Sequence, residues 1–505
     1  MLFNSQPFIL GFLPLTLAAV FAAGRLAGPR AALGCLIAAS LVFYAWWKPP
    51  FVALLAGSIL GNYLCGQAIA RAARAGRAGA AGRWLAAGVA GNLGLLGWFK
   101  YAGFLAATMA ALFGRQAPEL RIFLPLAISF FTFQQIMYLA DRRDPALPDP
   151  GFLGYAAFVA FFPHLIAGPI VRPREIIPQL LAPDLARPRI AALCEGSTLF
   201  LLGLAKKLVL ADLFARFADT GFDAAAHGAA LSFFSAWYAT AAYGLQIYFD
   251  FSGYSDMAIG LARMLNVRFP LNFDSPYKSR DIAEFWRRWH ITLGGFLRDY
   301  LYIPLGGSRG GGWLQARNLM LTMLACGLWH GAAWRFVLWG GLHGLYLAVH
   351  RLWRGAQGRW NQGRWNQGRV GHLPGPVAQA LTLLAVLAAW VPFRAAGLRV
   401  AGSVLAGLVG LHGIALPAMI VTWAPVLGWI ARPVPLLAHL GAARTLSFPE
   451  VSACLALGWG IALGAPQLHA LSQRGRSLAL VMSFAFTVQA LFFAPRVTPF
   501  LYFRF

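Results

Sequence analysis

The chain has 505 residues, 59% of them hydrophobic and 12% charged, whereas a soluble protein carries about 25% charged residues. Lys and Arg outnumber Asp and Glu by 42 to 17, but this excess lies between apolar segments, so we expect cytoplasmic loops facing anionic membrane lipid and no nucleic-acid partner. The composition excludes an ordinary soluble domain and predicts an all-α, polytopic membrane protein, because helices satisfy their own backbone in lipid.

Apolar segments long enough to span a bilayer recur along the chain. We expect about 11 to 13 of them to cross the membrane, with further re-entrant or interfacial helices. The first is predicted to be a retained helix and not a cleaved signal peptide, because no basic residue precedes Arg25. The basic segment Arg71–Arg83 predicts a cytoplasmic loop and therefore an external amino terminus. The candidate spans cover residues 8–24, 31–47, 51–70, 84–107, 119–140, 150–168, 190–211, 230–250, 315–330, 333–350, 376–393, 400–424, 451–468 and 478–494.

Two features interrupt the helical pattern. Proline and glycine between Phe161 and Pro173 predict a kinked or re-entrant element, since a helix cannot run through them undisturbed. A basic segment from Arg351 to Arg369 contains the sequence GRWNQ twice and predicts a cytoplasmic loop, because two copies are too few for a solenoid.

The stretch from Asp281 to His330 concentrates the chemically active side chains. Its two histidines, His290 and His330, each follow a tryptophan. His330 closes an apolar segment, and an ionisable residue at membrane depth is a functional candidate by default. The spacing of aromatic residues predicts a helix from Glu284 to Tyr302.

Further polar residues near these segments have structural or functional interpretations. Arg287 and Arg288, next to His290, either bind a phosphate-bearing ligand or anchor the helix at the membrane surface. Asp250 and Asp256 are six positions apart and do not share a helix face well, so they are interpreted as hydrogen-bonding or ion-pairing residues, with catalytic carboxylates as the alternative. Among the other histidines, His164 could line a cavity and His343 could face the same interior as His330. The five cysteines are dispersed and without a CxxC pattern, so no metal site is expected.

The residue set limits the possible reaction. The histidines have no GxSxG, HExxH, P-loop or dinucleotide-binding motif around them. What is left is a histidine acting as general base on a hydroxyl in a dry interior. Acyl transfer from a thioester to a hydroxyl needs such a base and a donor that stabilises the oxyanion, but no nucleophile on the enzyme.

Several segments resemble the membrane-bound O-acyltransferase (MBOAT) family, above all the bacterial branch that contains the membrane subunit of alginate O-acetyltransferase. They are FWRRWHITL, LRDYLYIPLGG and GLWHGAAWRFVLWGGLHG around the two histidines, with FYAWWKP, FFPHLIAGPIVRP, GLAKKLVLAD and QIYFDFSGYSDMAIGLAR before them. The resemblance implies a single MBOAT domain over residues 1–505: a core to about residue 350, a basic linker to about residue 372 and divergent helices to the end.

The resemblance also implies a fold with a tunnel and roles for named residues. His330 would be catalytic and His290 its partner at the site. Arg287, Arg288, Trp286 and Trp329 become candidates for binding substrate or coenzyme A. Acetyl-CoA would be the donor, with no bound cofactor or metal, and the acceptor an exported polysaccharide of the alginate, cellulose or peptidoglycan type. A periplasmic SGNH-type acetyltransferase would complete the transfer from the bacterial inner membrane.

Two alternatives stay open at this point. One is a lipid or protein O-acyltransferase of the same family. The other is a polysaccharide transporter without chemistry, although the Trp-His pairs and the lack of an inverted repeat count against it.

The carboxyl-terminal sequence FLYFRF contains one hydroxyl, on Tyr502. It is typical of an aromatic anchor at the membrane interface. It also resembles the aromatic terminus of the small partner in the related D-alanine transfer system, where a tyrosine is thought to carry the acyl group. Tyr502 is therefore either an anchor or an acyl relay.

Overall fold

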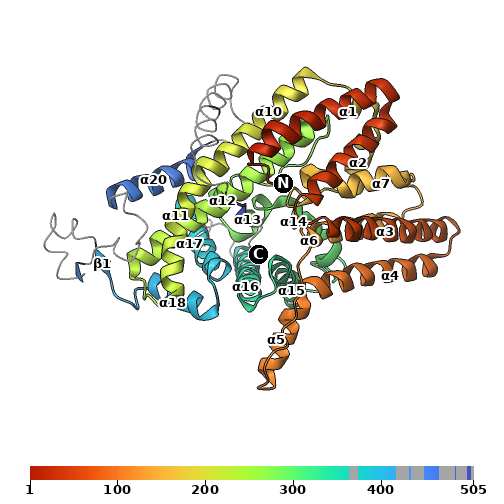
Figure 1. Cartoon of the computed structure of the whole chain (residues 1–505). Helices are drawn as coiled ribbons and strands as arrows, with labels where there is room; N and C mark the ends of the chain where they lie inside the picture. The colour runs from red at the N-terminus through yellow and green to blue at the C-terminus, as the bar shows by residue number, and fades with distance from the viewer. Residues whose placement is uncertain (363–372, 417–431, 434–447, 466–483, 485–497, 502–505) are drawn as a thin grey trace. The chain divides into compact units, whose positions relative to one another are not determined.

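The computed structural model describes residues 1–362, 373–416, 432–433, 448–465, 484 and 498–501. This part of the chain is helical apart from one short parallel pairing of β1 (Ala415–Leu416) with β2 (Arg432–Pro433), which confirms the all-α prediction (Figure 1). The chain divides into two compact units. Unit 1 comprises Met1–Leu204, Gly253–Leu271 and Leu480–Tyr502, and unit 2 comprises the rest. The assignment of residues 1–505 to a single domain stays a prediction.

Unit 1 is built mainly from helical hairpins near the amino terminus, of which α1–α2 and α3–α4 are the first (Figure 1). The last turns of α12 (Phe233–Met264) also belong to it. Its other elements are η1 (Pro7–Phe12), α1 (Leu13–Ala27), α2 (Pro29–Ala45), α3 (Pro50–Arg74), α4 (Ala78–Leu96), η2 (Gly97–Tyr101), α5 (Ala102–Leu112), α6 (Ile128–Asp141), α7 (Gly151–Ala160), α8 (Phe162–Leu165), α9 (Pro173–Leu181), η3 (Pro183–Ala186) and nearly all of α10 (Ile190–Ala205).

Unit 2 contains the first turns of α12 and the segments that carry the Trp-His pairs. Its elements are η4 (Lys206–Ala211), α11 (Asp212–Ala226), η5 (Pro276–Lys278), α13 (Ile282–Arg288), α14 (Ile291–Leu297), η6 (Arg298–Tyr302), α15 (Gly312–His330), α16 (Trp334–Gln362), α17 (Gly375–Arg394), α18 (Leu398–Leu408), the two strands and α20 (Phe448–Gly464).

Four helical segments of the described chain are candidate membrane spans. Pro7–Ala27, Pro50–Arg74, Ala78–Leu112 and Gly375–Arg394 are long and apolar enough to cross a bilayer. Shorter apolar helices lie at Pro29–Ala45, Gly151–Ala160, Leu398–Leu408 and Pro449–Gly464. The count of 11 to 13 crossings stays a prediction.

The structure changes the bounds of three predicted segments. The span expected over residues 119–140 is helical only from Ile128, because Pro125 and the left-handed Ala127 precede it. The span expected over 400–424 ends at Leu408, where Gly410 and Gly413 take positive φ. The predicted loop after Arg351 begins as helix, since α16 continues to Gln362. Of the span predicted over residues 478–494, only residue 484 is described.

The kink predicted between Phe161 and Pro173 is confirmed. α7 ends at Ala160, α8 covers one turn, and no helix follows before α9 begins at Pro173. Gly168 lies so close to His164 that a Cβ at position 168 would overlap the His164 backbone. The broken backbone therefore forms a tight, buried turn within unit 1.

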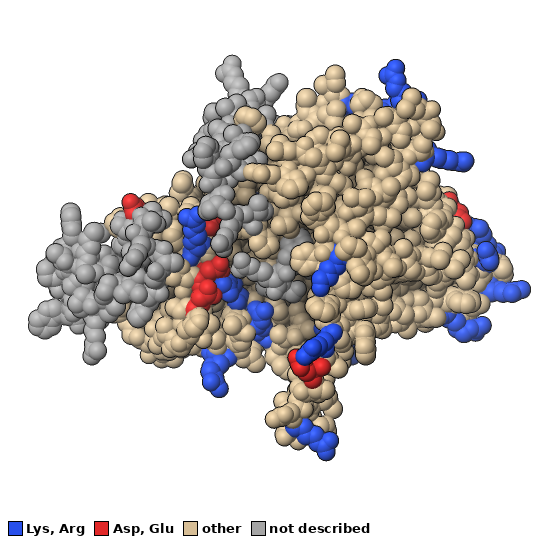
Figure 2. Space-filling model, viewed as in Figure 1, with Lys and Arg blue, Asp and Glu red and all other residues tan. Residues whose placement is uncertain are grey.

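Basic residues gather at the turns of both hairpins in unit 1. Arg25 and Arg30 flank the α1–α2 turn, and the α3–α4 turn lies within the segment Arg71–Arg83. Figure 2 shows several Lys and Arg side chains at the margin of this unit, beside a broad surface with few charges. Successive antiparallel helices bring both turns to one side, as the predicted cytoplasmic location of these arginines requires.

Helices α15 and α16 cross at two glycines. A Cβ at Gly327 would overlap the Phe336 carbonyl, and a Cβ at Gly340 would overlap the Met323 carbonyl. The two backbones therefore touch, as at the small-residue contacts that join helices in membranes. This contact fixes the end of α15, where His330 lies, against the start of α16.

Replacing Gly340 by alanine should loosen this crossing. We expect a loss of about 1–3 kcal/mol in folding free energy, the usual cost of overpacking a tight contact. Gly341→Ala is the matched control, because its Cβ would meet only Leu324 at 3.7 Å. Both variants gain the same helix propensity. Thermal unfolding in detergent should show a lower midpoint for Gly340→Ala alone, and equal midpoints would contradict the crossing.

Candidate active site

The helix predicted from Glu284 to Tyr302 is wrong at Trp289–His290. α13 ends at Arg288, Trp289 is extended, and His290 takes a left-handed conformation with φ 46° and ψ 53° before α14 begins. Such a conformation costs a non-glycine residue about 1–3 kcal/mol and persists only where the surroundings fix it. It turns His290 out of the helical path and into the buried interior of unit 2.

Asn272 fixes this turn from 18 positions earlier in the chain. Its backbone carbonyl accepts a hydrogen bond from the Ile291 amide at 3.0 Å. Its side-chain oxygen accepts one from the Thr292 hydroxyl at 2.9 Å and lies 3.0 Å from Nδ1 of His290. Asn272 is itself buried, so one side chain and its backbone hold both sides of the turn.

The hydrogen bonds determine which nitrogen of His290 carries the proton. The backbone amide of Thr292 also points at the Asn272 side-chain oxygen, at 3.3 Å, which identifies that atom as the acceptor. His290 Nδ1 must therefore donate, and Nε2 keeps its lone pair. Nε2 is buried and has no hydrogen-bond partner within the described part of the chain, so it is open to a substrate donor.

Burial keeps His290 neutral. It lowers the pKa of the imidazole from 6.5 to about 3, because the charged form would lose its hydration. At neutral pH His290 is a hydrogen-bond acceptor at Nε2 and has no proton to give from that atom. In this state His290 is better suited to orient a hydroxyl than to transfer protons.

His330 and His290 both lie near the ring of Trp329. The ring centroid of Trp329 is 6.2 Å from that of His290 and 4.8 Å from that of His330. The structure thus brings together both predicted histidines and the predicted binding residue Trp329. His330 is the last residue of α15, where the helix dipole favours positive charge on the imidazole.

Aromatic rings enclose His330. Its ring centroid lies 5.1 Å from Trp339 and 5.2 Å from Phe393, both nearly perpendicular to it. The indole nitrogen of Trp339 is buried and has no hydrogen-bond partner among the described residues. Gly331 follows His330 because a Cβ there would overlap the ring of Phe336. His330 is therefore closely packed among aromatic side chains.

Arg335 is a positioning residue that the sequence interpretation missed. Its guanidinium donates to the backbone carbonyls of Phe393 and Ala395, at 2.9 Å each, and so holds the end of α17 against unit 2's core. This fixes the Phe393 ring that contacts His330. A signal was available, since an arginine among apolar residues close after a candidate histidine has to find polar partners.

Trp286 and His343 extend the aromatic enclosure. The half-buried Trp286 donates its indole N–H to Nδ1 of His343 at 3.3 Å. The His343 ring lies 4.9 Å from that of Trp339, which separates it from His330. His343 therefore belongs to the same interior, as predicted, and links the predicted binding residue Trp286 to the rings around His330.

Arg287 and Arg288 have different surroundings. Arg288 pairs with Glu284 at 2.9 Å and donates to the Asp274 carbonyl at 3.2 Å, so it stabilises α13. Arg287 is exposed and has no carboxylate partner in the described chain. Arg351 and Arg354 are also exposed and have no carboxylate partner in the described chain. The positive charges of Arg287, Arg351 and Arg354 all act on the His350 imidazole. This triple of arginines, Arg287, Arg351 and Arg354, forms a basic corner of unit 2.

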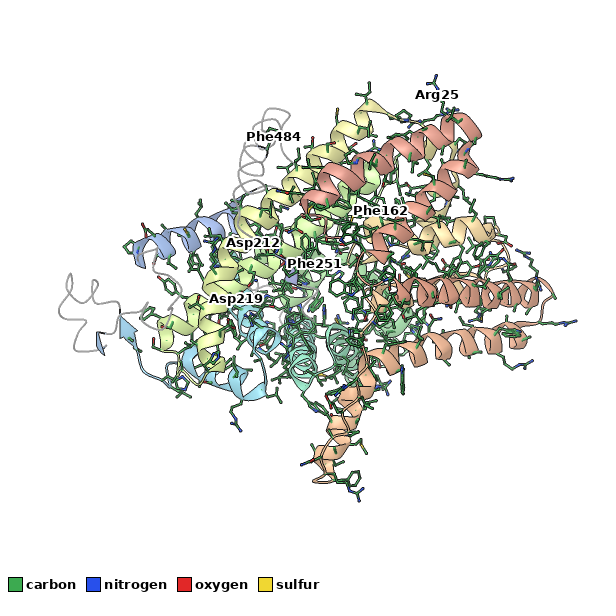
Figure 3. All side chains as sticks on the ribbon, in the orientation of Figure 1. Arg25, Phe162, Asp212, Asp219, Phe251 and Phe484 are labelled. Atoms are coloured by element: carbon green, nitrogen blue, oxygen red, sulfur yellow. The ribbon has the colours of Figure 1, made fainter. Side chains whose placement is uncertain are left out.

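Asp250 is an ion-pairing residue, as predicted. Its carboxylate contacts the ammonium of Lys207 at 2.8 Å, and Asp212 contacts the same ammonium at 2.8 Å. All three lie in unit 2, where Figure 3 shows Asp212 at the start of α11. The π-helical turn η4 aims Lys207 at both carboxylates. The Lys207 charge is therefore paired within this group of three residues.

The remaining predicted residues lie in unit 1. His164 is buried, with Nδ1 at 2.6 Å from the Gln134 amide. Tyr502 lies outside the described residues, but the residues before it are packed. The Asn4 side chain donates to the Thr498 carbonyl at 3.0 Å, and Phe500 lies edge-on to Tyr254 at 4.8 Å. Phe500 and Leu501 are thus buried in protein and not spread on the membrane interface.

No group of three or more His, Cys, Asp or Glu side chains within the described ranges could hold a metal ion. What the arrangement offers is acid–base and hydrogen-bond chemistry in a dry enclosure. It holds one neutral histidine with an open lone pair, a second histidine at a helix end, and a buried indole N–H beside it.

Comparison with known proteins identifies the family. Residues 126–368 match the model of the membrane-bound O-acyltransferase family. The chain is 42% identical to a peptidoglycan O-acetyltransferase of Helicobacter pylori, over 82% of this chain and 81% of that protein. It is 41% identical to a probable alginate O-acetylase, AlgI, of Pseudomonas aeruginosa, over 79% and 73%. A teichoic acid D-alanyltransferase of Streptococcus thermophilus is 28% identical over 45% and 57%. The chain belongs to the membrane-bound O-acyltransferase family.

Proposed function

We propose that the chain is an O-acetyltransferase of the bacterial inner membrane. It takes acetyl from cytoplasmic acetyl-CoA and passes it toward hydroxyls of an exported polysaccharide of the alginate, cellulose or peptidoglycan type. The observation that carries the proposal is that His290 and His330 both lie near the ring of Trp329 in a buried aromatic enclosure. The names of the relatives favour a polysaccharide over the lipid or protein acceptors, and family membership favours chemistry over simple transport.

In the proposed reaction His330 is the general base. It takes the proton of the acceptor hydroxyl as that oxygen attacks the thioester carbon. The tetrahedral intermediate collapses, the carbon–sulfur bond breaks, and the thiolate of coenzyme A takes the proton back from His330. The carboxyl-terminal end of α15 stabilises the transient imidazolium.

Two neighbours support this step. Neutral His290 accepts a hydrogen bond at Nε2 and so orients the hydroxyl or its donor. The buried indole N–H of Trp339, in contact with the His330 ring, is the best-placed donor for the developing oxyanion. Neither group changes its charge during the reaction, so neither has to be solvated.

The basic corner of unit 2 is the proposed entry side for acetyl-CoA. Coenzyme A carries several phosphates, and guanidinium groups bind phosphate in a bidentate manner. Arg287, Arg351 and Arg354 are exposed and have no carboxylate partner among the described residues, although Arg351 donates to the Gln315 side chain at 2.9 Å. Trp286, next to Arg287, leads through His343 to Trp339. Arg288, whose charge is already paired, supports the corner through α13. Acetyl-CoA is a substrate here, and no bound cofactor is proposed.

On the outward side we propose that Tyr502 relays the acetyl group to a periplasmic SGNH-type partner. Its phenol has an ordinary pKa near 10, so it needs a base to attack the thioester, and the resulting phenyl ester is a reactive donor. The burial of Phe500 and Leu501 supports a tail that enters the protein. The partner then moves acetyl from the ester to the polysaccharide hydroxyl.

His330→Ala should abolish acetyl transfer while the protein still inserts and folds. Loss of a general base removes about 10²–10⁴ of the rate. Polymer acetylation in cells and acetyl-CoA turnover in membranes measure the loss, and size-exclusion chromatography in detergent checks folding. Near wild-type turnover in a folded His330→Ala protein would remove the proposed base.

Arg287→Gln should raise the apparent KM for acetyl-CoA about tenfold with little change in kcat, since one charge-assisted phosphate contact is lost before the chemical step. Arg288→Gln is the matched control at the adjacent position. Because it removes a structural ion pair, Arg288→Gln should lower the midpoint of thermal unfolding. Its effect on the KM for acetyl-CoA should be small. If both variants change only thermal stability, the basic corner anchors the protein at the membrane surface and does not bind acetyl-CoA.

Tyr502→Phe should abolish polymer acetylation, because it removes one oxygen and leaves an aromatic tail. A phenyl acetate on Tyr502 adds a mass of one acetyl group to the carboxyl-terminal peptide, and trapping followed by mass spectrometry should detect it in wild type and in a strain lacking the partner. Full polymer acetylation by Tyr502→Phe would show that the tail is an anchor.

A further inference from the structure

A cavity of about 510 Å³ lies in unit 1, between the end of α1 and the turn η3. Phe21, Ala22 and Gly24 of α1 form one wall, and Pro183 and Ala186 of η3 form the other. Arg25 and Arg187 also line it, one from each side. None of these residues takes part in the site around His330.

Close packing and hydrogen bonds hold the walls of the cavity in place. Gly24 packs so tightly on η3 that a Cβ there would overlap Ala186. On the other side, the Asn266 amide donates to the carbonyls of Asp184 and Arg187 at 2.8 Å each. These bonds hold the backbone of Arg187 opposite Arg25.

The two arginines at the cavity carry uncompensated charge. Neither Arg25 nor Arg187 has a carboxylate partner within the described residues, and the nearby Asp184 pairs with Arg189 at 2.8 Å. Figure 3 shows Arg25 at the end of α1. A site with two free guanidinium groups above apolar walls is complementary to an anion that carries a hydrocarbon part.

The surface beside the cavity is apolar and exposed. Leu26, next to Arg25, is 84% exposed, and Ile190, next to Arg189, is 81% exposed. Arg25 is also near the end of the candidate span Pro7–Ala27, on the side where the arginines of both hairpins gather. Apolar side chains at such a rim are expected to meet lipid, which places the two guanidinium groups at the level of the cytoplasmic headgroups.

From this arrangement we infer that the cavity binds an anionic glycerophospholipid of the cytoplasmic leaflet. Its phosphate lies between Arg25 and Arg187, and one acyl chain runs along Ala22 and Phe21 into the bilayer, away from the cytoplasmic end of α1. The lipid joins α1 to η3 across the cavity and so stabilises unit 1. A free phosphate or coenzyme A would satisfy the arginines but would leave the apolar walls and rim without a partner.

The test uses the full-length protein purified in detergent and stripped of lipid. Dioleoyl phosphatidylglycerol is titrated in, with dioleoyl phosphatidylcholine, inorganic phosphate and acetyl-CoA as comparisons, and binding is followed by native mass spectrometry and thermal unfolding. Wild type should bind phosphatidylglycerol preferentially and unfold at higher temperature with it. The double variant Arg25→Gln/Arg187→Gln should bind it at least about tenfold more weakly.

Two controls separate this site from general surface charge. Arg77→Gln/Arg83→Gln removes two exposed arginines from the α3–α4 hairpin of the same unit and should bind as wild type does. Arg25→Lys/Arg187→Lys keeps both charges and should restore part of the affinity if the first variant folds poorly. Equal loss in the hairpin variant, or equal binding of phosphatidylcholine, overturns the lipid site. Displacement of the lipid by phosphate or acetyl-CoA at similar concentration overturns it in favour of a plain phosphate site.

Discussion

The hydrogen bonds that Asn272 accepts from the turn at His290 are the interaction on which the candidate active site depends. These bonds stabilise the non-helical turn between α13 and α14 and so place His290 in the buried interior. The same bonds fix the proton on Nδ1 and leave Nε2 open. One buried amide thus decides the position, the tautomer and the orientation of the histidine.

The second constraint is the close contact of α15 with α16. The backbones touch at Gly327 and Gly340, and this contact fixes the position of the end of α15. His330 is therefore positioned by helix packing and not by a flexible loop. Arg335 then fixes Phe393 against it through two backbone carbonyls. Rigid placement matters because an acyl transfer gains most from aligned reactants, and a displacement of about 1 Å can cost about a hundredfold in rate.

The sequence predicted the features that depend on local composition. The all-α class followed from apolar length, the break after Ala160 from proline and glycine, and the pairing role of Asp250 from its six-residue spacing to Asp256, which does not place both on one helix face. The left-handed turn at His290 was missed because its cause, Asn272, is a tertiary contact that no helical periodicity contains. The paired state of Arg288 was visible in principle, since Glu284 lies one helical turn before it.

The claim that His290 and His330 act as one site is tested most directly by a double-mutant cycle on acetyl-CoA turnover. His290→Ala, His330→Ala and the double variant are measured in the same membranes, with protein amounts matched. Because residues of one catalytic unit lose their effect together, the account predicts that the double variant is about as slow as the slower single variant. Losses that multiply would show that the two histidines act independently, and would contradict the account.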